Sequence, residues 1–143
     1  MNAGGGLYVL ELVLLRKVAV KIGRLGRCEF PAGAFWYVGS ARRGLAARIA
    51  RHTRRSKKLH WHIDYLLARA RLVRVWVWPE TTLSECELTE RLGGERAVPR
   101  FGASDCRCPG HLLCARGRAL PESLGGVGWA LTSPSGRGRA QRG

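Results

Sequence analysis

The sequence has 143 residues, of which 45% are hydrophobic, including five tryptophans, so a single domain with a substantial core is expected. The formal net charge of +15 and the pI near 11.1 favour a polyanionic partner, nucleic acid before an anionic membrane surface. The longest apolar run, residues 8–15, is too short for a membrane-spanning helix of about 20 residues, which argues against a membrane protein.

The cytoplasm is the expected compartment. The apolar run contains Glu11 and is followed by Arg16 and Lys17, which is unlike a secretory signal peptide. The five cysteines are odd in number and unevenly spaced, as expected for reduced thiols in a reducing compartment.

The first third of the chain predicts short antiparallel strands. Residues 7–15 and 18–22 are rich in Val and Leu, and residues 35–38 read Phe-Trp-Tyr-Val. The glycines of residues 23–26 and the Pro-Ala-Gly of residues 31–33 supply turns between these segments. Strands joined by such short turns pair antiparallel.

Two helices and a further strand are expected next. Residues 44–55 and 59–70 repeat apolar side chains with the helical period. Residues 72–78 alternate between valine and larger or charged side chains, which predicts a half-buried strand that Pro79 closes.

A third helix is predicted from Ser84 to Leu92. Ser84 and Glu87 form a capping-box pattern at its start, and two glycines follow its end. The whole pattern indicates an α+β domain, in which a small antiparallel sheet of three or more strands is flanked by three helices. Residues 115–143 are rich in Gly, Arg, Ser and Pro without a sustained period, so a basic, disordered tail is expected there.

Basic side chains are concentrated between residues 39 and 64, where no acid interrupts them and where phosphate binding is expected. The predicted nucleic-acid-binding residues of this region are Arg42, Arg43, Arg51, Arg54, Arg55, Lys57, Lys58, His60 and His62. The two histidines flank the apolar stripe of the second helix, so they could instead cap the edge of the core.

Arg48 and His52 are four residues apart and lie on one face of the first helix. A cation and an imidazole at a core boundary suit a site that grips one phosphate, although such pairs are also common on exposed helix faces.

Glu85 shares the inward face of the third helix with two leucines, whereas Glu87 points away from it. A half-buried carboxylate needs a cation or a metal ion as a partner. The alternative is an acidic residue that the helix dipole favours in the first turn.

The order of several motifs resembles the GIY-YIG nuclease superfamily. Gly6-Leu-Tyr8 and Tyr37-Val-Gly39 look like its two signature tripeptides, and Arg48, His52 and Glu85 follow in the family's order. The later pieces that resemble a small, stand-alone, uncharacterised prokaryotic branch are residues 57–67, 85–88 and 101–106. The resemblance covers residues 5–114, the expected nuclease domain, and the extra length of residues 17–30 predicts an additional hairpin between the tripeptides.

This resemblance implies a metal-dependent endonuclease that hydrolyses phosphodiester bonds in DNA, structure-specific and linked to repair, with RNA left open as a substrate. The implied catalytic residues are Tyr8, Tyr37, Arg48, His52 and Glu85. Arg48 would hold the phosphate, and Glu85, or alternatively Glu87, would bind one Mg²⁺ or Mn²⁺ ion. The family often places an asparagine near the site, for which only Ser104 or Asp105 could substitute here.

Two other classes of function compete with the nuclease. One is a non-catalytic, basic nucleic-acid-binding module that keeps the fold without the chemistry. The other is an interaction domain stabilised by zinc at Cys106, Cys108 and His111, with Cys114 or Cys86 as a fourth ligand. Zinc is the less favoured interpretation, because this spacing is not a standard structural pattern and buried thiols also serve as small hydrophobic groups.

Overall fold

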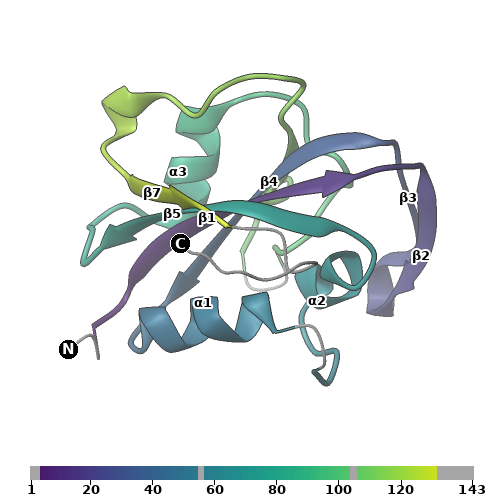
Figure 1. Ribbon diagram of the computed structural model, residues 1–143, viewed down its shortest axis with the longest axis horizontal. Helices are drawn as coiled ribbons and strands as arrows, with labels where there is room; N and C mark the ends of the chain where they lie inside the picture. The colour runs from purple at the N-terminus through teal and green to yellow at the C-terminus, as the bar shows by residue number, and fades with distance from the viewer. Residues whose placement is uncertain (1–3, 55–56, 104–105, 132–143) are drawn as a thin grey trace.

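A computed structural model describes residues 4–54, 57–103 and 106–131 of the chain. Five strands form one antiparallel sheet in the order β6-β4-β1-β5-β7 (Figure 1). These strands are β1 (Gly6–Leu14), β4 (Gly33–Ala41), β5 (Arg71–Pro79), β6 (Leu112–Cys114) and β7 (Val127–Ala130). The helices are α1 (Leu45–Thr53), α2 (His62–Leu67) and α3 (Glu85–Leu92). The predicted α+β class, an antiparallel sheet with three helices, is confirmed.

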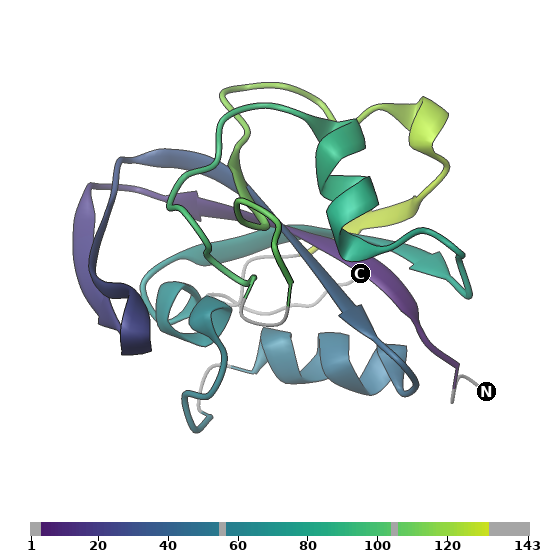
Figure 2. The ribbon, with the colours of Figure 1, turned by 180° about the vertical axis from the view of Figure 1, so that it is seen from behind.

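Helices cover both faces of the sheet. Helices α1 and α2 lie below it in Figure 1, and α3 lies above it together with the segment that leads to β7; Figure 2 shows the same layers from behind. Strand β1 contributes to both layers because its side chains alternate between the two faces. Tyr8 and Leu10 pack in the core toward α1 and α2, whereas Leu7 and Val9 pack in the core toward α3.

The additional hairpin predicted between the tripeptides is present. Strands β2 (Val18–Ile22) and β3 (Gly26–Phe30) pair with each other as a separate two-stranded sheet. A single 3₁₀ turn, η1 (Gly23–Leu25), joins them where the glycines predicted a turn. The hairpin extends from one end of the main sheet (Figures 1 and 2), and its buried Ile22 and Phe30 join the core on the α2 side.

Helix α2 is shorter than predicted. The periodicity predicted a helix over residues 59–70, but the helix begins at His62 and ends at Leu67. The Asp64 carboxylate accepts hydrogen bonds from the backbone N–H groups of His60 and Trp61, which holds the residues before the helix in a turn. Leu59, the first residue of the predicted helix, is 42% exposed as a result.

Helix α3 agrees closely with its prediction. The Ser84 hydroxyl accepts from the Glu87 N–H at 3.0 Å, and the Glu87 carboxylate accepts from the Ser84 N–H at 2.8 Å, which is the expected capping box. The helix ends at Leu92, and Gly93 follows with a φ of 68°, a left-handed conformation that glycine adopts without strain.

The segment after Cys114 corrects two predictions. Strand β7 pairs with β5, so disorder was wrongly predicted for residues 115–131; the remainder of the predicted tail, residues 132–143, lies outside the described residues. The half-buried pattern predicted for β5 holds over most of the strand, where Val75 and Val77 are buried and Arg74 is exposed. It fails at Trp78, which is only 6% exposed and donates to the Leu124 carbonyl at 2.8 Å. The alternation did not predict this because tryptophan can fill either a surface or a core position.

No helix in the described part of the chain has the length and apolar character needed to cross a membrane.

Candidate active site

The two tripeptides lie side by side in the centre of the sheet. Strands β1 and β4 pair so that Tyr8 faces Gly39 across the ladder. The rings of Tyr8 and Tyr37 consequently lie on the same face, with their centroids 6.4 Å apart. Both tyrosines line an open cleft of about 890 Å³, together with Arg48 and Glu85.

Gly39 makes room for the ring of Tyr8. A Cβ atom at position 39 would lie 2.5 Å from the Tyr8 hydroxyl oxygen and from the ring carbon that carries it. Such contacts are far inside van der Waals distance, so any larger residue would displace the phenol. The glycine of the second tripeptide is therefore explained by close packing against the tyrosine of the first.

We expect Gly39→Ala to lower the free energy of unfolding by about 1–3 kcal/mol, because an overpacked core has to move the Tyr8 ring. The measurement is a double-mutant cycle with Tyr8→Ala in urea unfolding. In the Tyr8→Ala background, the added methyl group should have little effect. If Gly39→Ala were equally destabilising in both backgrounds, the Tyr8 ring would not be the reason that position 39 requires glycine.

His52 contacts Tyr8 rather than the cleft. The imidazole is 2% exposed, and its Nε2 lies 2.7 Å from the Tyr8 hydroxyl oxygen. Burial lowers the pKa of His52 to about 4, outweighing the opposite effect of Asp64, so the ring is neutral near pH 7. The prediction that His52 grips a phosphate together with Arg48 is therefore wrong, because α1 turns the imidazole into the core.

Burial raises the pKa of the Tyr8 phenol well above its usual value, and the nearby Arg48 guanidinium offsets part of this rise. Burial likewise raises the pKa of the Tyr37 phenol. Both phenols are therefore neutral at physiological pH in the unliganded protein.

Arg48 is held in place from two sides. Its guanidinium donates to the Ser40 carbonyl at 2.9 Å and lies over the ring of Trp61, 4.4 Å from the centroid. Trp61 also lines the cleft and stacks against Arg51. A guanidinium fixed by a carbonyl and an indole is oriented before any ligand arrives.

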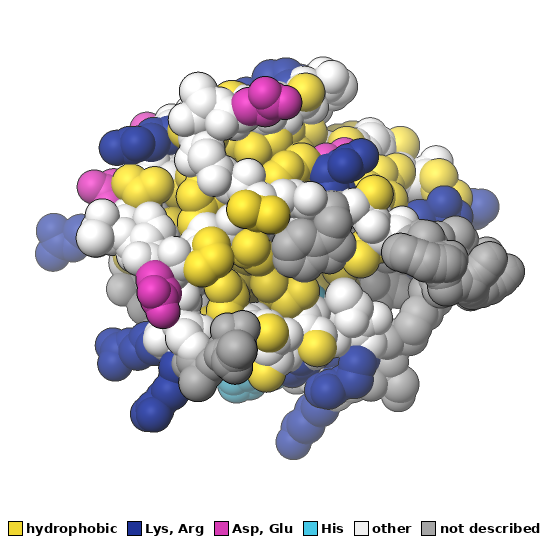
Figure 3. Space-filling model, turned by 60° about the vertical axis from the view of Figure 1, so that its left-hand side comes forward, with side chains coloured by type: hydrophobic (Ala, Val, Ile, Leu, Met, Phe, Trp, Pro, Cys, Tyr) yellow, Lys and Arg dark blue, Asp and Glu magenta, His cyan; other side chains and the backbone are white. Residues whose placement is uncertain are grey.

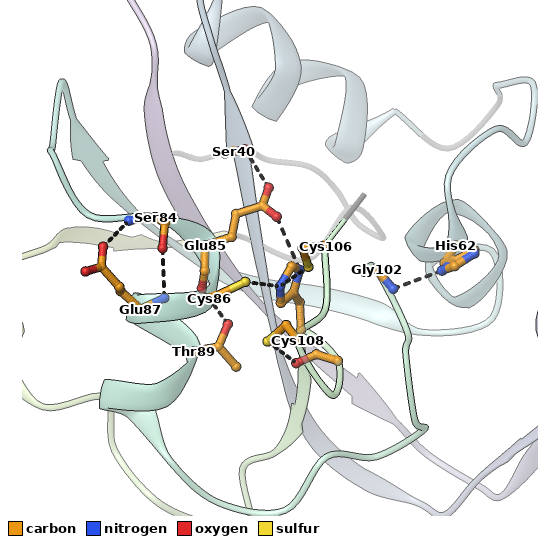
Figure 4. Close-up of polar contacts among 12 residues, drawn as sticks. Ser40, His62, Ser84, Glu85, Cys86, Glu87, Thr89, Gly102, Cys106 and Cys108 are labelled. Carbon is orange, nitrogen blue, oxygen red and sulfur yellow. Dashed lines mark hydrogen bonds and ion pairs between the residues drawn. The ribbon is translucent and has the colours of Figure 1, made fainter. Parts of the chain in front are cut away.

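Glu85 stands at the first position of α3 and reaches into the cleft. One carboxylate oxygen accepts from the Ser40 hydroxyl at 2.5 Å, and the other lies 3.2 Å from His111 Nδ1 (Figure 4). The side chain keeps 30% of its surface exposed. Glu87 is exposed, and its carboxylate accepts from the Ser84 N–H in the capping box (Figure 4). It is not among the residues that line the cleft. Of the two proposed metal ligands, Glu85 alone is positioned for the cleft.

The predicted nucleic-acid-binding residues divide into groups. Arg42 lines the cleft. The side chains of Arg43, Arg54, Lys58 and His60 are exposed. In the view of Figure 3, Lys and Arg side chains project around the outline of the face, whereas hydrophobic side chains occupy much of its middle.

Three other members of the predicted set are engaged within the protein. Arg51 makes two hydrogen bonds to the buried Asp64 carboxylate, at 2.8 and 2.9 Å, so its charge is already paired within the protein, and its predicted phosphate contact stays a prediction. Lys57 donates to backbone carbonyl oxygens of α1 and its C-cap. His62 Nδ1 accepts from the Gly102 N–H at 2.9 Å, which supports its alternative role at the edge of the core.

Arg55, Ser104 and Asp105 lie outside the described residues, so the predicted phosphate contact of Arg55 and the suggested substitutes for the family asparagine are not located.

A group of metal-binding side chains lies next to Glu85. The possible ligand atoms of Cys86, Cys106 and His111 are all within 4.8 Å of one another. This differs from the predicted set, since Cys86 belongs to the group, whereas Cys114 lies in β6 and packs in the core on the α1 and α2 side. The spacing of the sequence did not predict Cys86 as a principal member of this group. Cys86 is twenty residues before Cys106, and only the fold of α3 against the loop brings the two together.

Two residues of the cleft were not singled out from the sequence. Ser40 contacts both Glu85 and Arg48, and Trp61 supports the arginine. Ser40 follows the second tripeptide directly, which was the available signal. His111, which was considered only for zinc, lies against the cleft carboxylate.

A comparison with protein families identifies the chain. The model of the family described as "Domain of unknown function DUF123" matches residues 7–124, which is most of the sequence. The chain belongs to this family. The matched range includes all residues of the cleft except Gly5 and Gly6, the Cys-Cys-His group and the segment up to Leu124. No curated protein and no solved structure matches the chain.

Proposed function

We propose that this member of the family is a metal-dependent endonuclease of the GIY-YIG type, which hydrolyses phosphodiester bonds in DNA. The observation that supports it is the meeting of Tyr8, Tyr37, Arg48 and Glu85 in one open cleft. These side chains come from two strands and two helices. The two tyrosines also pack in the core, whereas the charged Arg48 and Glu85 have no packing role that would bring them to the same cleft. A guanidinium, a carboxylate and two phenols that line one cleft suit a bound phosphate and a divalent cation.

The cleft fits a divalent cation through Glu85. Each oxygen of a carboxylate can accept two hydrogen bonds or ligands, so the contacts with Ser40 and His111 leave lone pairs directed elsewhere. Mg²⁺ and Mn²⁺ bind through one or two carboxylates and fill the remaining positions with water and phosphate oxygens. Such an ion would stabilise negative charge on the phosphate and make a bound water more acidic.

Arg48 orients the scissile phosphate in this proposal. Its contacts with Ser40 and Trp61 hold the guanidinium at the wall of the cleft, where it can donate to phosphate oxygens. The same charge lowers the pKa of the Tyr8 phenol relative to burial alone. Arg48 therefore acts both on the substrate and on the phenol beside it.

Tyr8 and His52 supply a route for a proton. The Tyr8 hydroxyl donates to Nε2 in the tautomer of His52 that leaves this nitrogen unprotonated. A proton from the attacking water can pass to the phenol oxygen as the phenol proton passes to His52, so no isolated phenolate has to form in the buried site. His52 is a positioning residue that acts through Tyr8.

The exposed cations around the site support a nucleic-acid substrate. Arg42 lines the cleft, and Arg43 follows it on the same loop. Backbone phosphates are contacted by such residues without reading the base sequence, so substrate shape is expected to determine specificity.

The experiment is cleavage of labelled duplex, flap, branched and single-stranded DNA, with one RNA duplex for comparison. Cleavage in Mg²⁺ or Mn²⁺ that stops with chelator is the expected result, with DNA cut faster than RNA. Salt-sensitive binding of these substrates without cleavage of any of them would contradict the proposal and would indicate a non-catalytic binding module.

A further inference from the structure

Two thiols and an imidazole converge behind the cleft. Cys86 comes from the first turn of α3, Cys106 from the loop before β6, and His111 from the residue next to β6. His111 Nε2 lies 3.5 Å from Cys86 Sγ and 3.7 Å from Cys106 Sγ. Figure 4 shows both sulfur atoms directed toward the same imidazole.

These distances suit a tetrahedral zinc ion. Zinc–sulfur bonds of about 2.3 Å and zinc–nitrogen bonds of about 2.0 Å place the two donor atoms about 3.5 Å apart at a tetrahedral angle. The observed nitrogen-to-sulfur distances agree with this value to within a few tenths of an ångström. All five cysteines are free thiols, so no disulfide uses these side chains.

Cys108 is the candidate for a fourth donor, because it belongs to the same loop as Cys106. Its buried thiol donates to the Gly110 carbonyl at 3.6 Å and lies outside the group of three, so it has to turn toward Cys86, Cys106 and His111 to reach the ion. The Arg96 guanidinium lies 3.8 Å from Cys108 Sγ, where its positive charge offsets that of a thiolate-rich site.

We propose that Cys86, Cys106, Cys108 and His111 bind one structural zinc ion. Three thiolates and one imidazole fill a tetrahedral site, so no position remains open for substrate. The ion links the first turn of α3 to the loop that precedes β6, because each segment contributes ligands.

The zinc site also orients the cleft carboxylate. With Nε2 on the metal, the other nitrogen of His111 carries the proton and lies 3.2 Å from Glu85 Oε1. This nitrogen is buried. A carboxylate behind a metal-bound imidazole is a recurrent arrangement that fixes the orientation of both groups. The inference does not depend on nuclease activity, because a structural zinc ion would also serve a binding module.

The test is the metal content of the full chain, purified under reducing conditions without a polyhistidine tag. One zinc ion per chain is expected, and replacement by Co²⁺ should give a thiolate-to-cobalt charge-transfer band. Cys86→Ser and Cys106→Ser should lose most of the bound zinc. Cys28→Ser and Cys114→Ser are the matched controls, since both thiols are buried in the core away from the cluster, and they should retain one ion per chain.

Cys108→Ser should weaken zinc binding and reduce the cobalt charge-transfer band, since one thiolate is lost. An unchanged band would remove Cys108 from the ligand set and contradict the four-ligand site. Wild-type protein that takes up neither zinc nor cobalt would overturn the proposal, as would a cobalt spectrum without thiolate bands. The wild-type spectrum is decisive even where a variant fails to fold.

Discussion

Glu85→Gln is expected to reduce the single-turnover rate of DNA cleavage on the order of 10³-fold, while the affinity for DNA stays within a few-fold of wild type. Glutamine keeps the size of the side chain and can still accept from the Ser40 hydroxyl. It removes the negative charge that holds a divalent cation in the cleft. The measurement is the cleavage rate at saturating enzyme, with binding followed by fluorescence anisotropy in chelator.

Glu87→Gln is the matched control for this substitution. Glu87 belongs to the same helix and lies two residues away, but it is exposed and serves the capping box. Glutamine is also accepted at this position of a capping box, so cleavage and stability should change little. Equal losses in the two variants would show that the net charge of α3, and not the position of Glu85, determines the rate.

Asp64→Asn is expected to lower the free energy of unfolding by about 3 kcal/mol, the largest stability effect that we predict. The carboxylate is fully buried and accepts from both terminal nitrogens of Arg51 and from two backbone N–H groups. Asparagine cannot accept all of these bonds and leaves the guanidinium without its counter-charge. Urea unfolding at pH 7 measures the effect.

The control is Glu29→Gln, which breaks an ion pair with Arg27 whose two side chains are 60% and 71% exposed. A change below about 1 kcal/mol is expected there. If Asp64→Asn were no more harmful than Glu29→Gln, the buried pair would contribute nothing beyond a surface ion pair.

Lowering the pH should separate the contributions of His52 and Asp64 to the free energy of unfolding. The folded state lowers the pKa of His52 from 6.5 to about 4, so the unfolded chain binds the extra proton and stability falls as the pH drops through this interval. Burial alone would raise the pKa of Asp64, but Arg51 and the two backbone N–H groups outweigh burial and lower it. The contribution of Asp64 to stability is therefore lost only below about pH 4. The difference between wild type and Asp64→Asn should therefore persist at pH 5 and shrink below pH 4.

Local signals in the sequence were sufficient for much of the fold. The capping box of Ser84 and Glu87 fixed the start of α3, and the helical period then placed Glu85 on the inward face. The tripeptides ending at Tyr8 and beginning at Tyr37 both fall in strands, and these strands pair as neighbours. These features succeed because they depend on residues close together in the chain.

The remaining features depend on contacts between distant segments. The ion pair with Asp64 engages Arg51 within the protein, and no pattern within α1 distinguishes it from its exposed neighbours. Likewise, β7 forms because β5 offers an edge, although its own sequence has no strand period. Cys86 and His111 are close in space only because the loop before β6 folds back onto α3, which the sequence alone did not predict.

The most direct test of the central claim is a single order-of-addition experiment on wild-type protein. A complex with labelled branched DNA is formed in chelator, divided, and given excess Mn²⁺ in one half only. We predict that the DNA stays bound and intact in chelator and is cut within one turnover after Mn²⁺ is added. Complexes that stay intact in both halves would contradict the assignment of the Tyr8, Tyr37, Arg48 and Glu85 cleft as a nuclease active site.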